Sequence, residues 1–114
     1  MSVITTHVLD VARGGPAEGV PVLLEAHPVN GAWMPLASGA TDADGRVPML
    51  LEPHAPVAPG RYRLTFDTAA YFTRLGVEAF FPEVRIVFEI RDPAQHYHVP
   101  LLLSPFGYST YRGS

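Results

Sequence analysis

Short apolar runs alternate with polar positions along this chain, and clusters of turn-forming residues separate the runs. Twelve prolines and ten glycines stand between segments rich in Val, Leu, Phe and Tyr. This punctuation is typical of a β-sandwich or barrel, and no helix-length apolar period dominates. The pattern predicts an all-β domain with eight strands in two four-stranded sheets. The expected strands span residues 3–10, 20–27, 32–39, 46–51, 61–67, 84–91, 96–103 and 108–112.

One segment departs from the strand pattern and predicts a short helix. Residues 68–76 read TAAYFTRLG, with Asp67 or Thr68 as the N-cap, Ala-rich interior positions and Gly76 as the closing residue. Tight turns are expected where Gly, Pro and Asp gather, because these residues favour chain reversal. Those turns fall at residues 13–16, 42–45 and 59–60.

Alternation within the expected strand 96–103 sorts its side chains onto two faces, since successive side chains of a strand point to opposite sides. The bulky apolar set is expected to fill the core and comprises Tyr97, Val99, Leu101 and Leu103. The opposite set points outward and comprises His96, His98, Pro100 and Leu102.

Two further strands carry polar residues on the face away from the core. In segment 46–51 the inward set is Val47, Met49 and Leu51, and the outward set is Arg46, Pro48 and Leu50. In the first strand the alternation is weaker, with Ile4, Thr6 and Val8 inward and Thr5, His7 and Leu9 outward. If the three strands share a sheet, His7, Arg46 and His98 lie on one common face. A face that mixes polar and apolar residues suggests an interface.

Composition narrows the possible classes of function. The chain has 114 residues, enough for a single domain over 1–114, and 47% of them are hydrophobic. A net charge of −3 without a basic cluster argues against nucleic-acid binding. The absence of cysteine excludes disulfides and thiolate chemistry. The sequence shows no leader and no apolar run long enough for a membrane span, so we expect a cytosolic protein without membrane contact.

Two imidazoles and a guanidinium on one face suit hydrolysis of an acyl-type bond. A neutral His accepts a proton from water, and an Arg stabilises the charge that develops on a carbonyl oxygen. An isolated His on a strand is more often an ordinary polar residue, so the alternation alone does not decide the matter. The spacing of His96 and His98 also suits a metal, yet zinc sites need three or four ligands and no further ligand motif accompanies them. We expect no functional metal.

Several motifs resemble those of one known family, the transthyretin-like 5-hydroxyisourate hydrolases. They are His7–Asp10, residues 41–46 (TDADGR) and residues 98–114 (HVPLLLSPFGYSTYRGS), with further agreement at residues 19–22, 70–72 and 81–84. The resemblance covers essentially the whole chain, and the ending Tyr-Arg-Gly-Ser is its most specific part. It implies a transthyretin-like two-sheet β-sandwich of about eight strands with one short helix.

The resemblance also implies an activity and an assembly. The family hydrolyses 5-hydroxyisourate to 2-oxo-4-hydroxy-4-carboxy-5-ureidoimidazoline, the step after urate oxidation in purine degradation, without a cofactor. Its members are homotetramers, arranged as dimers of dimers with sites at the dimer–dimer interface. Carried over to this sequence, the catalytic residues are His7, Arg46, His98 and Ser114. The substrate-binding residues are Tyr111, Arg112 and Gly113.

The resemblance leads to a mechanistic hypothesis. In it, His98, aided by His7, activates water, while Arg46 and Arg112 orient the substrate and stabilise the oxyanion, and Ser114 relays a proton. Which His acts as the base stays open, because neighbouring imidazoles titrate together. Two rival functions also stay open: a transthyretin-like carrier of small ligands without catalysis, and an adhesive or structural β-sandwich.

Overall fold

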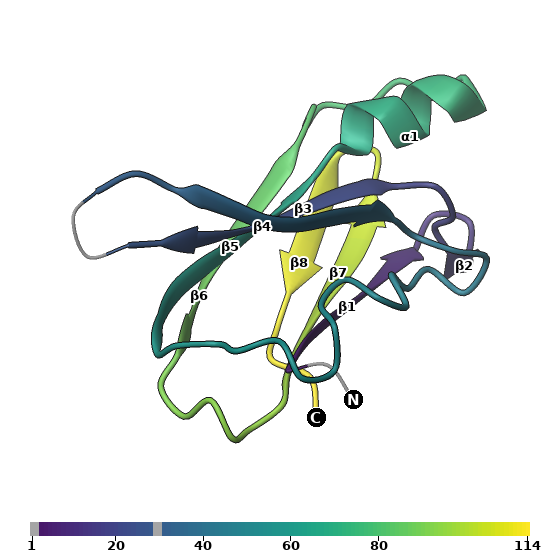
Figure 1. The fold of residues 1–114 in the computed structure, drawn as a ribbon. Helices are drawn as coiled ribbons and strands as arrows, with labels where there is room; N and C mark the ends of the chain where they lie inside the picture. Colours follow the sequence, from purple (N-terminus) through teal and green to yellow (C-terminus); the bar gives the residue numbers. More distant parts are fainter. Residues whose placement is uncertain (1–2, 29–30) are drawn as a thin grey trace.

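The computed structural model describes residues 3–28 and 31–114. They form eight strands and one short helix (Figure 1). In chain order these are β1 (Ile4–Asp10), β2 (Gly15–Pro16), β3 (Pro21–His27), β4 (Met34–Ala40), β5 (Gly60–Phe66), α1 (Thr68–Leu75), β6 (Val84–Ile90), β7 (Tyr97–Ser104) and β8 (Gly107–Thr110). The all-β prediction with eight strands and one short helix is confirmed.

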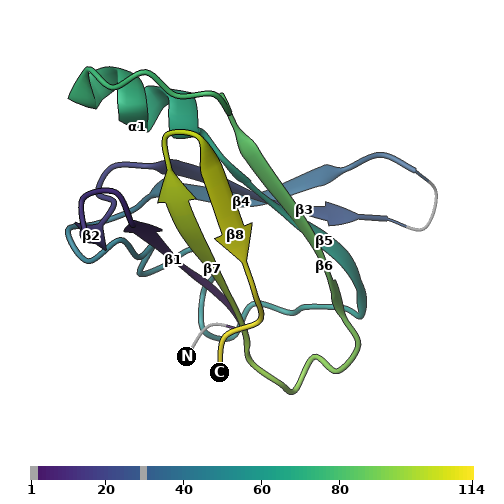
Figure 2. The ribbon, with the colours of Figure 1, turned by 180° about the vertical axis from the view of Figure 1, so that it is seen from behind.

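The strands form two four-stranded sheets, with orders β2-β1-β7-β8 and β4-β3-β5-β6. All neighbouring strands are antiparallel except β1 and β7, which lie parallel although they come from opposite ends of the chain. Figure 2 shows β1, β7 and β8 side by side from behind, with the C-terminal segment ending beside the start of β1. This parallel pair positions the candidate site.

The core lies between the two sheets, where each strand contributes its inward-facing set. On β7 the inward residues Tyr97, Val99, Leu101 and Leu103 are buried, as the alternation predicts. On β1 the inward set includes Thr6, whose hydroxyl donates to the carbonyl of Val99 at 2.7 Å and is thereby satisfied in the core. The weak alternation of the first strand is confirmed.

The helix α1 lies at one end of the sandwich (Figures 1 and 2). The Asp67 carboxylate caps it by accepting from the backbone N–H of Ala70 at 3.0 Å, and Gly76 ends it in the left-handed conformation. Tyr71 and Phe72 pack into the core from this end. No helix within the described residues is long and apolar enough to span a membrane.

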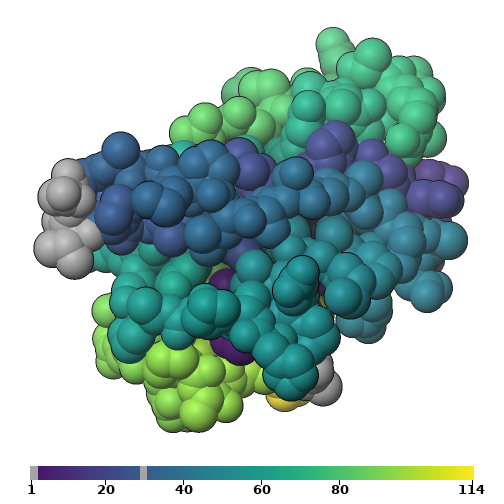
Figure 3. Space-filling view, in the orientation of Figure 1, coloured from purple at the N-terminus to yellow at the C-terminus, as the bar shows by residue number. Residues whose placement is uncertain are grey.

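The prediction of a strand over 46–51 is wrong. Only Arg46 makes a β-bridge, to His7, and the residues after it form turns within the long connection between β4 and β5. The inward and outward sets accordingly change: Leu50 is 3% exposed, while Met49 is 65% exposed. Proline at position 48 removes a backbone donor, which accounts for the failure of the ladder to continue. The space-filling view shows this connection lying across the front face (Figure 3).

The eighth strand comes instead from a short pairing that the sequence did not reveal. β2 is two residues long and pairs with the end of β1, joining Leu9 to Pro16 and Asp10 to Gly15. Its sequence, Gly-Pro, is a turn signal rather than a strand signal. The structure therefore keeps the count of strands but changes which segment completes the first sheet.

Candidate active site

The outer face of β1 and β7 carries the polar side chains expected from the alternation. The parallel register places Thr5 opposite His98 and His7 opposite Pro100. Because side chains of one parity share a face, Thr5 and His7 lie on the same side of the sheet as His96 and His98. The prediction that β1 and β7 contribute to one polar face is confirmed.

The turn at residues 42–45 places Arg46 next to this face. The Asp42 carboxylate accepts from the backbone N–H groups of Asp44 and Arg46 at 2.9 and 3.0 Å. Gly45 takes a φ of +79°, and its carbonyl accepts from the N–H of Val8 at 2.8 Å. The turn is thus fastened to β1, and Arg46 emerges beside His7.

The C-terminal segment covers the same face from the other side. The backbone N–H of Gly113 donates to the carbonyl of His98 at 2.8 Å, so the last residues run against β7. Pro100, expected to point outward, is buried because Gly113 lies over its ring. This contact places Ser114 at the same pocket as His98.

These elements enclose an open pocket of about 340 Å³. It combines residues from β1, the connection after β4, β7 and the chain end. Its lining residues are Thr5, Thr6, Arg46, Val47, Pro48, His96, His98 and Ser114. Three of the four expected catalytic residues, namely Arg46, His98 and Ser114, therefore lie at one pocket.

The imidazole of His98 is half-buried and neutral at neutral pH. Burial lowers its pKa from the ordinary value of 6.5, and the charges of Arg46, His96 and His7 lower the pKa further. The Nδ1 atom lies 2.8 Å from the Thr5 hydroxyl. A neutral ring with one nitrogen held in place is suited to accept a proton at the other nitrogen.

His7 is held differently. Its Nε2 atom lies 2.8 Å from the carbonyl oxygen of Asp44. A carbonyl only accepts, so this nitrogen carries a proton and donates it. His7 is absent from the pocket lining, although its charge acts on His98. Within the chain, its position supports the turn that carries Arg46.

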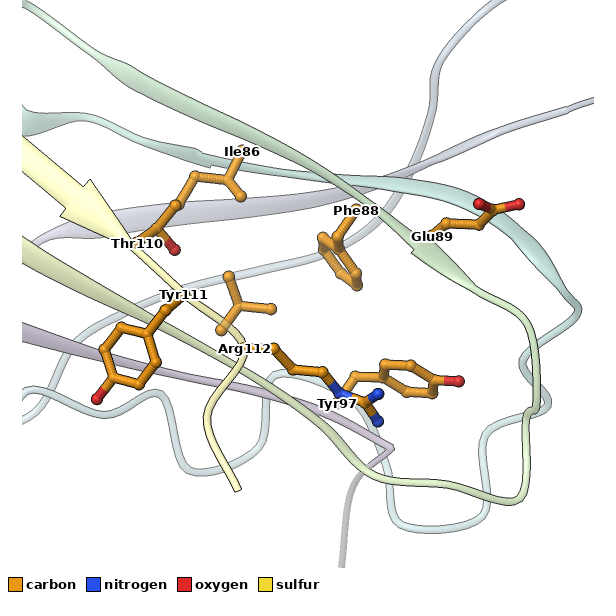
Figure 4. A pocket seen from close by; sticks show the side chains of 8 residues that line it. Ile86, Phe88, Glu89, Tyr97, Thr110, Tyr111 and Arg112 are labelled. Carbon is orange, nitrogen blue, oxygen red and sulfur yellow. The ribbon is translucent and has the colours of Figure 1, made fainter.

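The side chains of Tyr111 and Arg112 lie at a different pocket, of about 240 Å³, between β6 and the chain end (Figure 4). The Arg112 guanidinium lies over the Tyr97 ring, 4.5 Å from its centroid. It also donates to the side chain of Gln95 at 3.1 Å and to the carbonyl of His96 at 3.3 Å. The structure thus separates these two residues from the pocket of His98.

The residues that could hold a metal are few. Among residues 3–28 and 31–114, no group of three or more His, Cys, Asp or Glu side chains is placed to hold a metal ion. The imidazoles of His96 and His98 both face the Thr5 hydroxyl, at 2.9 and 2.8 Å.

A family model described as the HIUase/Transthyretin family matches residues 4–113. The chain belongs to this family. The 5-hydroxyisourate hydrolase of Salmonella dublin is 49% identical over 113 residues, which cover 99% of this chain and 82% of that protein. The resemblance inferred from the sequence motifs is confirmed.

Solved structures of HIUase/Transthyretin members share the fold. The Klebsiella pneumoniae 5-hydroxyisourate hydrolase has a TM-score of 0.85 and 43% identity, and the match covers 100% of both chains. Transthyretin from Sparus aurata has a TM-score of 0.90 and 35% identity, covering 99% of this chain and 97% of the other. The transthyretin-like fold is confirmed, but the fold is common to proteins with both names.

Sequence reasoning placed Thr5 and His96 on the outer face of this HIUase/Transthyretin chain but gave them no part in the site. Their shared parity with His7 and His98 was a usable signal, because each stands two residues before one of these histidines. The register that sets Thr5 opposite His98 was not readable from the sequence.

Proposed function

We propose that the chain is a 5-hydroxyisourate hydrolase that forms 2-oxo-4-hydroxy-4-carboxy-5-ureidoimidazoline without a cofactor. The observation that carries this proposal is the meeting of neutral His98, Arg46 and Ser114 at one open pocket. The 49% identity to a relative named as this hydrolase supports the substrate. The activity is that of a hydrolase acting on a cyclic amide.

His98 is the general base of the proposed reaction. Its Nε2 atom makes no hydrogen bond to any residue in 3–28 or 31–114, whereas Nε2 of His7 already donates to the Asp44 carbonyl. As His98 takes one proton from water, the water oxygen bonds to the ring carbonyl carbon. The carbon–nitrogen bond of the amide then breaks, and the proton passes to the departing nitrogen.

Arg46 stabilises the oxyanion that forms during this attack. Its backbone is held by the Asp42 carboxylate and by the bridge to His7, so the guanidinium is presented from a fixed turn. A preorganised positive group is effective here because it needs no reorganisation as charge develops. Ser114, which lines the same pocket, relays a proton to the substrate, and His7 supports the turn that carries Arg46.

Gly113 allows the chain end to approach His98, and this contact supports its assignment to the site. Substrate binding by Tyr111 and Arg112 stays a prediction from the family resemblance. The contacts of Arg112 with Gln95 and His96 support a different contribution, which is to anchor the segment that carries Gly113 and Ser114. Both contributions predict that deletion of residues 111–114 lowers turnover.

The assembly proposed for the chain is a homotetramer built as a dimer of dimers. The outer strands β6 and β8 leave backbone groups available for pairing with another copy. Large side chains are exposed beside β8, namely those of Phe106, Tyr108 and Tyr111. Light scattering after size exclusion tests the proposal, since a mass near four chains supports it and a single chain contradicts it.

The cytosolic location expected from the sequence stays a prediction, which fractionation of producing cells tests.

The alternative function is carriage of a small ligand without catalysis, favoured by the TM-score of 0.90 to a transthyretin. To decide between the two, 5-hydroxyisourate is generated from urate with urate oxidase, and its ultraviolet decay is followed. The wild-type chain, His98→Ala and the exposed-loop control His54→Ala are compared with spontaneous decay. Acceleration by wild type and by the control, but not by His98→Ala, supports the hydrolase. Equal decay with and without wild type overturns it in favour of carriage.

A further inference from the structure

The Thr5 hydroxyl lies between two imidazoles on the outer face of the first sheet. Its oxygen is 2.8 Å from Nδ1 of His98 and 2.9 Å from Nε2 of His96. The two rings lie nearly parallel, 6.2 Å apart and tilted by 20°. All three side chains line the pocket of Arg46 and Ser114.

A hydroxyl has one proton to donate, and this number couples the two rings. Thr5 cannot donate to both imidazoles, so at least one ring donates an N–H to its oxygen, which has two lone pairs. In two arrangements the Thr5 proton goes to the other ring. In the first, Nδ1–H of His98 donates to Thr5, and Thr5 donates to Nε2 of His96. In the second, every proton runs in the opposite direction.

The two arrangements leave His98 with opposite chemistry at Nε2. In the first arrangement Nε2 is unprotonated and can accept a proton, whereas in the second it already carries one. The Cδ2 edge of the ring, next to Nε2, faces the chain end, because a Cβ at Gly113 would lie 2.6 Å from Cδ2. Nε2 is bonded to Cδ2 and is the ring nitrogen that Thr5 does not hold.

We propose that Thr5 is a positioning residue that holds His98 as the Nδ1-protonated tautomer, with His96 as the acceptor of the Thr5 proton. The inference rests on the proposed hydrolysis, for which His98 must present a free Nε2. When Nε2 takes the proton of water, the hydrogen bond from Nδ1–H to Thr5 is already in place. No donor and acceptor have to exchange roles during the step. The positive Arg46 nearby favours a lone pair over an N–H at the pocket.

The test compares Thr5→Val, which keeps the branched shape and removes the hydroxyl, with Thr5→Ser, which keeps the hydroxyl. Histidine is labelled with ¹⁵N, and the ring shifts of His98 are assigned by their loss in His98→Asn. In wild type we expect protonated Nδ1 and unprotonated Nε2 for both His98 and His96. In Thr5→Val we expect the His98 signals to shift towards the Nε2-protonated form and kcat to fall about tenfold or more, with KM unchanged. Thr5→Ser should restore both readouts.

Each outcome bears on a separate claim. Nε2-protonated His98 in wild type overturns the inference without any variant, and so does a Thr5→Val chain with unchanged tautomer and turnover. If the wild-type chain does not accelerate the decay of 5-hydroxyisourate, the proposed hydrolase is refuted instead. The two failures are distinguishable because the tautomers are read from the NMR spectra independently of turnover. A change in KM alone in Thr5→Val, with kcat preserved, also counts against positioning of the base.

Discussion

Gly113 lies directly against the ring of His98, and its N–H donates to the His98 carbonyl at 2.8 Å. A Cβ at this position would lie 2.6 Å from Cδ2 of His98 and 3.2 Å from the Pro100 ring. The backbone of the chain end thus approaches the candidate base more closely than any side chain would allow. Glycine is required here by contact rather than by backbone conformation.

Gly113→Ala should therefore push the chain end away from His98 and displace Ser114. Because a displacement of about 1 Å can cost on the order of 100-fold in rate, we expect kcat/KM to fall about 10- to 100-fold. The free energy of unfolding should change by less than about 0.5 kcal/mol, since the segment is terminal. The matched control is Gly107→Ala, where the nearest atom to a Cβ is 3.8 Å away. Equal activity of the two variants would contradict the argument.

The sequence predicted the sandwich well because its strongest signals are local. Alternation on β7 and the caps of α1 depend only on residues close in the chain, and both are confirmed. The prediction of a strand over 46–51 failed because the apolar residues there are buried by an irregular connection. A short alternating run does not distinguish such a connection from a strand.

The candidate site could be predicted only in part, since it depends on contacts between distant segments. Family motifs selected Arg46, His98 and Ser114, which the fold brings together. The bridging position of Thr5 follows from the parallel register of β1 and β7, which residue patterns do not encode. The separation of Arg112 from this pocket likewise follows from the path of the chain end rather than from its motif.

The turn before Arg46 provides a second prediction. Gly45 has a φ of +79°, and a Cβ there would lie 2.3 Å from the carbonyl oxygen of Val8. Gly45→Ala should lower the free energy of unfolding by about 1–3 kcal/mol and reduce turnover, because the strained turn displaces Arg46. Urea denaturation and the decay assay measure the two effects. Gly15→Ala is the control, since nothing lies within 4 Å of its Cβ position. Full stability of Gly45→Ala would show that the turn does not need glycine.

A buried hydrogen bond away from the pocket should affect stability but not activity. The Tyr71 hydroxyl donates to the carboxylate of Asp10 at 2.7 Å, and Asp10 is 1% exposed. Burial raises the pKa of Tyr71, so the hydroxyl keeps its proton and donates. Tyr71→Phe should cost about 1–3 kcal/mol in urea denaturation, because it leaves a buried carboxylate oxygen unpaired. Tyr108→Phe, at an exposed position, should cost less than about 0.5 kcal/mol. Similar losses in the two variants would refute this explanation.

The pH dependence of activity follows from His98. Its pKa is lowered by burial first and by Arg46 next, so the neutral base persists below the ordinary pKa of 6.5. We expect kcat/KM to be constant above that value and to fall as pH drops through the lowered pKa. The same group contributes stability that is present above the unfolded pKa and is lost as pH falls through the folded pKa.

Removing the charge of Arg46 should move this titration. In Arg46→Gln the pKa of His98 should rise towards 6.5, measured by the proton resonance of its ring in an NMR titration. Arg91→Gln is the control, because the Arg91 side chain is 85% exposed and is paired with Glu89. An unchanged or lower His98 pKa in Arg46→Gln would mean that the two groups do not interact as the structure places them.

The last prediction separates anchoring by Arg112 from substrate binding. If Arg112 anchors the chain end, removing its partner in Gln95→Ala should reproduce part of the loss in kcat seen in Arg112→Ala. The double variant should then lose less than the two single losses combined, because both changes break one contact. Arg112→Lys should also lower kcat, since an ammonium lacks the planar guanidinium that lies on the Tyr97 ring and donates to Gln95. Direct binding of substrate predicts instead a raised KM in Arg112→Ala and wild-type kinetics in Gln95→Ala. The pattern of kcat and KM across these four chains therefore decides whether Arg112 acts on the substrate or on the segment that ends at Ser114.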